Sequence, residues 1–107
     1  MQDTQALTES SYYILLALVK PQHGYGIMQE AERMSSGRVR LAAGTLYGAL
    51  TAMVEKGWIH QLPVEAGSRK KEYQLTDLGR RVLEAEYARL KELVAHGKHV
   101  LEAEDGE

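Results

Sequence analysis

Apolar residues recur at helical spacing in several stretches of the chain. The first stretch, residues 8–20, begins with a capping threonine and ends at Pro21, which predicts a short helix. Its apolar side chains leave no polar face, so we expect it to be covered on more than one side, by its own domain and by a second surface such as another subunit. Residues 27–35 carry apolar positions three and four apart, which predicts a second helix after a glycine-containing turn at 23–26.

A short strand and a third helix are predicted in the middle of the chain. Residues 38–41 alternate between polar and apolar, which is typical of a strand. The helix is predicted over 43–56, because apolar residues form one stripe there and Gly57 follows as a stop signal. The buried stripe is expected to consist of Leu46, Leu50, Met53 and Val54.

A hairpin follows the third helix. Residues 58–64 and 71–75 have the composition of strands, and the polar residues 65–70 between them include a glycine. Helices followed by such a hairpin predict a winged helix-turn-helix, so the expected fold is mainly α with a small β-hairpin wing. We expect this α+β domain to occupy residues 1–75.

A long helix is predicted from the capping residue Thr76 to about residue 101, followed by an acidic tail over 102–107. Its apolar positions repeat at intervals of four and three, the pattern of a coiled-coil seam. About 25 residues span about 37 Å, more than one small domain covers, so we expect a homodimer. The expected interface comprises Tyr12, Leu15, Leu16, Leu83, Tyr87, Leu90, Val94 and Leu101.

Composition excludes several classes of protein. The chain of 107 residues has no cysteine, which excludes disulfides, thiolate metal sites and a cysteine nucleophile. The longest apolar run, residues 12–19, is far shorter than the roughly 20 residues of a membrane span. We therefore expect a cytoplasmic protein without a membrane partner.

Charge is distributed unevenly. The net charge is -2, yet residues 33–81 hold nine basic and four acidic side chains, while the acidic tail is strongly negative. A basic middle is compatible with DNA binding, although a solvated surface without a partner has the same pattern.

Two surfaces are candidates for contact with double-stranded DNA. The outer face of the third helix carries small and hydroxyl residues that let a backbone approach, although an ordinary solvated helix looks similar. The hairpin tip carries consecutive basic residues suited to phosphates, although lysines also protect edge strands from pairing. The candidate residues are Gly44, Thr45, Tyr47, Gly48 and Thr51 on the helix and Arg69, Lys70 and Lys71 on the hairpin.

Four blocks of sequence, taken together, resemble the PadR family of transcriptional regulators. They are His-Gly-Tyr-Gly-Ile at 23–27, Gly-Thr-Leu-Tyr at 44–47 with Leu50, Lys-Gly-Trp-Ile at 56–59, and Arg-Lys-Lys-Glu-Tyr at 69–73 with Leu75, Thr76 and Gly79. The resemblance implies a third helix and wing that bind an operator, and a two-fold dimer built by the first and last helices. It adds Tyr25 to the DNA candidates. Ala43 stands where the family often has proline, and the short tail resembles the compact branch.

The expected function is therefore a sequence-specific transcriptional regulator. We expect a repressor that binds a pseudo-palindromic operator as a homodimer and, as the resemblance implies for many members, is released by a small-molecule effector. A winged-helix module that binds another protein is the alternative. The sequence leaves open the operator, the effector and the regulated genes.

Other chemistry has weaker support. No grouping of catalytic residues is present, so we expect neither an enzyme nor a cofactor. His96 and His99 have a spacing that can chelate a metal, but surface histidines are the preferred interpretation and no metal site is expected. Four aromatic residues could line a ligand cavity at the dimer interface, although packing is preferred for them. They are Tyr12, Tyr13, Trp58 and Tyr87.

Overall fold

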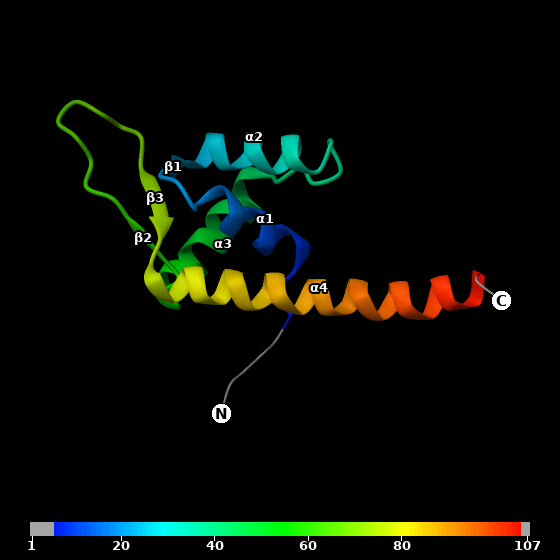
Figure 1. Ribbon diagram of the computed structural model, residues 1–107. Helices are drawn as coiled ribbons and strands as arrows, with labels where there is room; N and C mark the ends of the chain where they lie inside the picture. The colour runs from blue at the N-terminus through cyan, green and yellow to red at the C-terminus, as the bar shows by residue number, and fades with distance from the viewer. Residues whose placement is uncertain (1–5, 106–107) are drawn as a thin grey trace.

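Three short helices and a small sheet share one core, and a fourth, much longer helix runs along the outside of them (Figure 1). The computed structural model describes residues 6–105. Figure 1 shows the hairpin projecting at one end of the molecule and the C-terminal half of the long helix extending beyond the other elements. The elements are α1 Glu9–Ala17, β1 Gln22–His23, α2 Gly24–Met34, α3 Ala43–Glu55, β2 Ile59–Gln61, β3 Glu72–Leu75 and α4 Asp77–Asp105.

The sheet has three antiparallel strands in the order β1-β3-β2. The hairpin predicted from the sequence is confirmed, with shorter strands than expected. The strand predicted at residues 38–41 is wrong. Val39 and Leu41 in that segment are buried while Arg38 and Arg40 are exposed, so the alternation is real. No neighbouring strand pairs with this segment, and the edge strand lies at Gln22–His23 instead.

The helix ends follow local capping chemistry. Thr8 caps α1 as predicted, because its Oγ1 accepts a hydrogen bond from the Ser11 N–H at 3.1 Å. The turn predicted at 23–26 is wrong: α2 already begins at Gly24, and Nδ1 of His23 accepts a hydrogen bond from the Gly26 N–H at 3.1 Å. An imidazole nitrogen therefore satisfies the donor that a serine or aspartate usually satisfies.

The core is built from all four helices and both long strands. Three of the four residues predicted on the inner stripe of α3 are buried, but Val54 is 42% exposed, because the core ends with Met53 and the next position faces solvent. The buried apolar residues are Ile14, Leu15, Leu18, Ile27, Ala31, Val39, Leu41, Leu46, Leu50, Met53, Ile59, Tyr73 and Leu83.

The start of α4 is fastened to the end of α3. Thr76 caps α4 as predicted: its Oγ1 accepts from the Gly79 N–H at 3.0 Å and donates to the Gly57 carbonyl at 2.5 Å. The Thr76 N–H donates to the Trp58 carbonyl at 3.0 Å. Gly79 is buried directly against that same carbonyl oxygen, so only a residue without a side chain fits there.

The length of α4 exceeds the prediction. The helix has 29 residues and ends at Asp105, so it spans about 43 Å and includes most of the segment expected to be an acidic tail. Gly106 and Glu107 lie outside the described residues.

Replacing Gly79 with alanine should reduce the free energy of unfolding by about 2 to 3 kcal/mol, because the new Cβ would overlap a backbone carbonyl that cannot move aside easily. Urea unfolding followed by circular dichroism measures the change. Gly48→Ala is the matched control, since a Cβ there meets nothing and alanine favours a helix by roughly 0.5 to 1 kcal/mol. Equal stabilisation by both alanines would contradict the packing described for Gly79.

Candidate functional site

The outer face of α3 is exposed and carries mostly small side chains. All five candidate residues on this helix are exposed, on the side away from buried Leu46 and Leu50. A Cβ built on Gly44 or Gly48 would meet no atom within 4 Å, so a large molecule can approach the backbone there. The Thr51 hydroxyl donates to the Tyr47 carbonyl at 2.9 Å, which leaves its oxygen available mainly as an acceptor.

The beginning of α2 meets α3 at this face. Tyr25, on the first turn of α2, is 65% exposed. The phenol of Tyr47 lies against the Cα of Gly24, where a Cβ would contact the Tyr47 ring. Tyr47 itself remains 48% exposed, so the two helices together present two tyrosine side chains to solvent.

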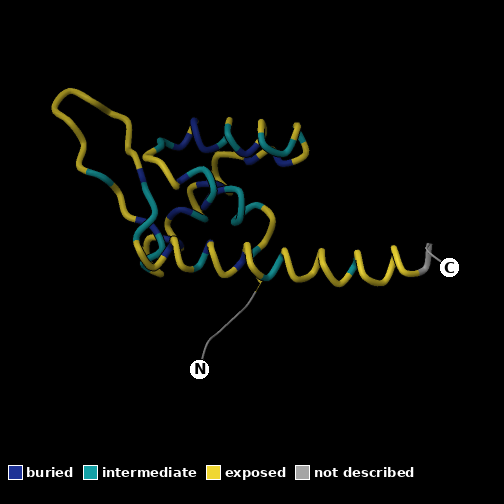
Figure 2. The backbone as a smooth tube through the Cα atoms, viewed as in Figure 1, coloured by how far each residue is buried: buried dark blue, intermediate teal, exposed yellow. Residues whose placement is uncertain are grey.

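The hairpin loop is the second candidate surface. Residues 63–71 are all exposed, and the loop extends well beyond the helices (Figure 2). Its three basic residues make no ion pair with any other described residue. These residues are Arg69, Lys70 and Lys71.

Most other basic residues of the segment 33–81 are already engaged. Arg33 pairs with Glu30 at 2.7 Å, and Arg38 pairs with Glu9 at 2.5 Å. The Lys56 ammonium lies 4.6 Å from the ring centroid of Trp58. Longer contacts of 3.7 and 3.6 Å join Arg40 to Glu32 and Arg80 to Glu84. Arg81 on α4 is exposed and also makes no ion pair with a described residue, so the positive charge without a partner lies on the hairpin loop and at Arg81.

The residues expected at a dimer interface fall into three groups, which are buried, half-buried and exposed in the single chain. Leu15 and Leu83 belong to the core of the single chain and leave almost no surface for a partner, which corrects the expectation for these two positions. Tyr12, Leu16 and Leu90 are half-buried. Tyr87, Val94 and Leu101 are exposed on α4, and so are three apolar residues that were not predicted at the interface, Leu78, Leu93 and Val100.

We call the exposed apolar residues of the distal half of α4 the distal stripe; they are Leu93, Val94, Val100 and Leu101. Val94 is 70% exposed. Figure 2 shows this half of the helix exposed along nearly all of its length. Apolar side chains on one side of a helix that no other element covers favour association with another apolar surface.

Sequence reasoning missed a buried carboxylate between α1 and α4. Glu86 is 5% exposed and accepts two hydrogen bonds from Arg89, at 2.8 and 2.6 Å, and a third from the Leu7 N–H at 3.3 Å. The hydrogen bonds from Arg89 lower the pKa of Glu86 despite its burial.

Burial raises the pKa of neighbouring Tyr12, and the nearby side chains Tyr87 and Glu86 add to that effect. Glu86 lies seven residues before Leu93 and therefore on the same side of the helix as the apolar repeat. This spacing is the one sequence signal of its burial.

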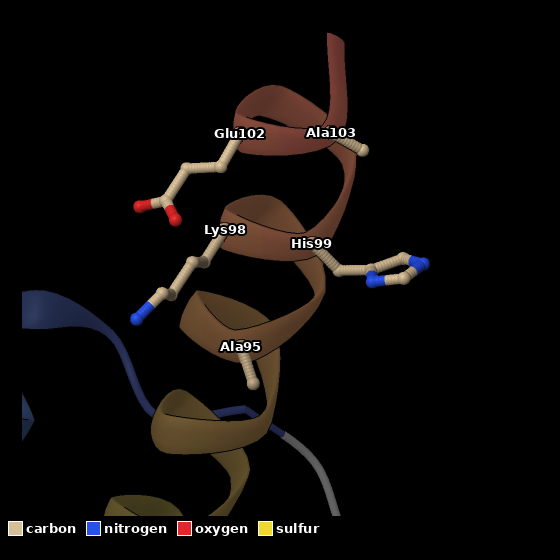
Figure 3. Close-up of a pocket in the computed structure, with 5 residues that line it drawn as sticks. All are labelled: Ala95, Lys98, His99, Glu102 and Ala103. Carbon is tan, nitrogen blue, oxygen red and sulfur yellow. The ribbon is translucent and has the colours of Figure 1, made fainter. Parts of the chain in front are cut away.

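The structure offers little support for a small-molecule or metal site within one chain. A shallow depression on α4 is lined by residues of this helix alone, with Lys98 and Glu102 on one side and His99 on the other (Figure 3). Within the described part of the chain, no three His, Cys, Asp or Glu side chains gather as metal ligands would. None of the described helices is long and apolar enough to cross a membrane.

The fold and the exposed surfaces define a winged helix-turn-helix with an appended C-terminal helix. Residues 14–85 match the transcriptional regulator PadR-like family, and the chain belongs to this family. A curated relative is an uncharacterized 37.1 kDa protein in transposon TN4556 of Streptomyces fradiae, 37% identical over 79 residues. That match covers 73% of this chain, but the chain spans only 22% of the length of that relative.

Solved structures support the same family. A PadR family transcription regulator from Clostridium difficile R20291 has a TM-score of 0.74 at 24% identity, over 88% of this chain and 99% of the other. At this identity it shows the shared fold. PadR of Bacillus subtilis, solved in complex with operator DNA, has a TM-score of 0.59 at 26% identity, over 69% of this chain and 44% of the other.

The buried carboxylate gives a prediction for stability against pH. The folded-state pKa of Glu86 is lowered, so the carboxylate contributes stability that is present above its ordinary pKa of 4.5 and is lost as the pH falls through the folded-state pKa. Glu86→Gln should lower the free energy of unfolding at pH 7 by about 1 to 3 kcal/mol, with a smaller difference in acid. Urea unfolding at pH 7 and at successively lower pH values measures both effects.

Glu30→Gln is the matched control. Glu30 also accepts two hydrogen bonds from an arginine three residues later, but its side chain is 37% exposed, so its loss should cost less than about 1 kcal/mol. If both variants lose the same stability at pH 7, the burial of Glu86 is not the reason for its effect.

Proposed function

We propose that this protein binds double-stranded DNA as a homodimer and regulates transcription. Two copies of α3 would enter successive major grooves about 34 Å apart, and each hairpin loop would contact flanking phosphates. Membership in a family of transcriptional regulators supports this proposal, as does the structural similarity to a PadR protein that was solved with operator DNA.

One observation carries the proposal: the hairpin loop holds three consecutive basic side chains that no described carboxylate neutralises. Phosphate binding depends on local positive charge that can release counterions from DNA, and paired arginines elsewhere supply less of it. The same feature favours DNA over a protein partner as the ligand of the winged helix.

The exposed face of α3 is suited to base contacts. Gly44 and Gly48 permit a close approach of the backbone, and Thr45 and Tyr47 add hydroxyl groups near the start of the helix. We assign Thr51 as an acceptor, suited to the amino group of a base, because its hydroxyl proton is already donated within the helix and is not available to a phosphate oxygen. Tyr25 would reach the backbone beside the groove from the first turn of α2.

We further propose that residues 1–75 form the DNA-binding part and that α4 forms the dimer. The distal stripe would pack on the partner subunit, together with Tyr87, Leu90 and the outer side of α1 at Tyr12 and Leu16. Burying these side chains removes apolar surface that one chain leaves in water.

Repression is the expected outcome of operator binding, because a dimer seated within a promoter excludes polymerase from it. An effector that releases the dimer would bind between the subunits, near Tyr12 and Tyr87, since the depression on α4 is too open to enclose a ligand.

Replacing Lys70 or Lys71 with alanine should weaken DNA binding across sequences and reduce the slope of log affinity against log salt concentration by about one. Fluorescence anisotropy with a labelled duplex at several salt concentrations measures the slope. Arg33→Ala is the control, because Arg33 is occupied by Glu30 and its removal should leave the slope unchanged. Wing variants that bind with the wild-type slope would rule out the hairpin as a phosphate contact.

Replacing Val94 with arginine should give a folded monomer in place of a dimer, because the charge would have to be buried in the interface. Sedimentation velocity measures the mass, and circular dichroism confirms that the helices are retained. Ala95→Arg, one position along on another side of α4, should leave the dimer intact. A stable dimer of the Val94 variant would show that the distal stripe is not the interface.

A further inference from the structure

The Tyr47 ring occupies space that is free only because residue 24 is a glycine. A Cβ built on Gly24 would lie 2.8 Å from Cζ of the Tyr47 ring and closer still to the hydroxyl oxygen. Atoms at such separations overlap, so the phenol of Tyr47 lies in space that only glycine leaves free. Gly24 is buried beneath this ring, whereas Tyr47 is half-exposed on the outer face of α3.

The end of the Tyr47 side chain packs against Gly24. No hydrogen bond joins the Tyr47 hydroxyl to another described residue, so the contact with Gly24 is what holds the end of the side chain. A phenol fixed in this way keeps both its donor and its acceptor capacity for a ligand. A contact that is already oriented loses little side-chain entropy when DNA binds.

We infer that Gly24 is a positioning residue that holds the Tyr47 hydroxyl in the orientation used to contact duplex DNA. This inference rests on the proposed function, and it adds a residue that does not itself touch DNA. Because Gly24 has no side chain, it leaves space at the start of α2 for the Tyr47 side chain of α3.

Two interactions of His23 fix the start of α2, where Gly24 lies. His23 caps α2 through its Nδ1 and pairs with Glu72 of β3, the strand that carries the hairpin. The residue directly before Gly24 is therefore connected to the wing, while Gly24 contacts the recognition helix. Tyr47 and the hairpin, the two proposed DNA contacts, are therefore both connected to His23 and Gly24.

Alanine at position 24 should act through Tyr47 and leave the fold intact. Gly24 does not have a positive φ, so alanine is compatible with its backbone, and the overlapping atoms form the far end of a side chain that can rotate away. Gly26 offers a matched control in the same helical turn. It is also buried, and a Cβ there would displace the end of the Gln22 side chain, whose Oε1 accepts a hydrogen bond from the His23 N–H at 3.1 Å; Gln22 is not part of α3.

The test is a double-mutant cycle in DNA binding. The wild-type protein first selects duplexes from a randomised library, and an enriched duplex of about 30 base pairs, long enough for two half-sites, serves as the probe. We expect Gly24→Ala and Tyr47→Ala each to weaken binding about tenfold, and the double variant to bind no more weakly than Tyr47→Ala. Tyr47→Phe should lose as much affinity as Tyr47→Ala, and Gly26→Ala should bind like the wild type. Thermal unfolding of each variant verifies that the fold is retained.

Several outcomes would overturn the inference. These are normal binding by Gly24→Ala, equal weakening by Gly24→Ala and Gly26→Ala, or losses for Gly24→Ala and Tyr47→Ala that multiply in the double variant. Normal binding by Tyr47→Phe would exclude the hydroxyl as the contact. If the wild-type protein enriches no duplex, the proposed function fails as well; if it enriches one that Gly24→Ala binds normally, only the role of Gly24 is lost.

Discussion

The close contact between Trp58 and Gly79 is the constraint on which the arrangement of the molecule depends. At this point the end of α3, the first strand of the hairpin and the start of α4 meet within a few residues, and the Thr76 hydroxyl bonds to both sides of the junction. The Leu75 N–H adds a bond to the Leu18 carbonyl at the end of α1. Because Gly79 has no side chain, α4 can lie against the Trp58 carbonyl and leave the core in a fixed direction. The positions of the hairpin and of the long helix are therefore determined together.

The direction of α4 divides this helix into two parts with different surroundings. Its first turns are covered by the core through Leu83, and its second section by α1 and the segment before it, where Glu86 accepts a hydrogen bond from the Leu7 N–H. Beyond Leu90 the helix leaves the other elements, and its apolar residues face solvent. A buried and fully bonded carboxylate marks the boundary between these parts. It fixes the chain before α1 against α4, so α1 is held against the section of this helix that precedes the distal stripe.

Local chemistry made much of this fold predictable, and long-range pairing explains what was missed. Thr8, Thr76 and Gly57 mark helix ends by rules that need only neighbouring residues, and the period of α3 determines which of its residues are exposed, so that part of the candidate site follows from the sequence. Periodicity predicts that Leu15 and Leu83 face apolar surroundings, but it does not distinguish the core of one chain from a partner. A strand of two residues is too short to have a period, so β1 was missed and residues 38–41 were assigned a strand that has no partner. The contacts of Gly24 with Tyr47 and of Glu86 with Leu7 join residues far apart in sequence, and no local rule reports them.

The distribution of charge resolves the apparent conflict between a net charge of -2 and the basic surface that we propose binds DNA. On the helical body, carboxylates lie beside most arginines, so those charges cancel at short range and contribute little to the field at a distance. The loop at residues 63–71 is different, because it projects from the body (Figure 1) and carries three basic residues, none in an ion pair with a described residue, against one acidic residue, Glu65. At physiological ionic strength charges interact over roughly 8 Å, so a phosphate near the loop experiences mainly its local positive charge. Net charge is therefore a poor guide to this surface, whereas the pairing of each arginine and lysine identifies the side chains that are free to bind an anion.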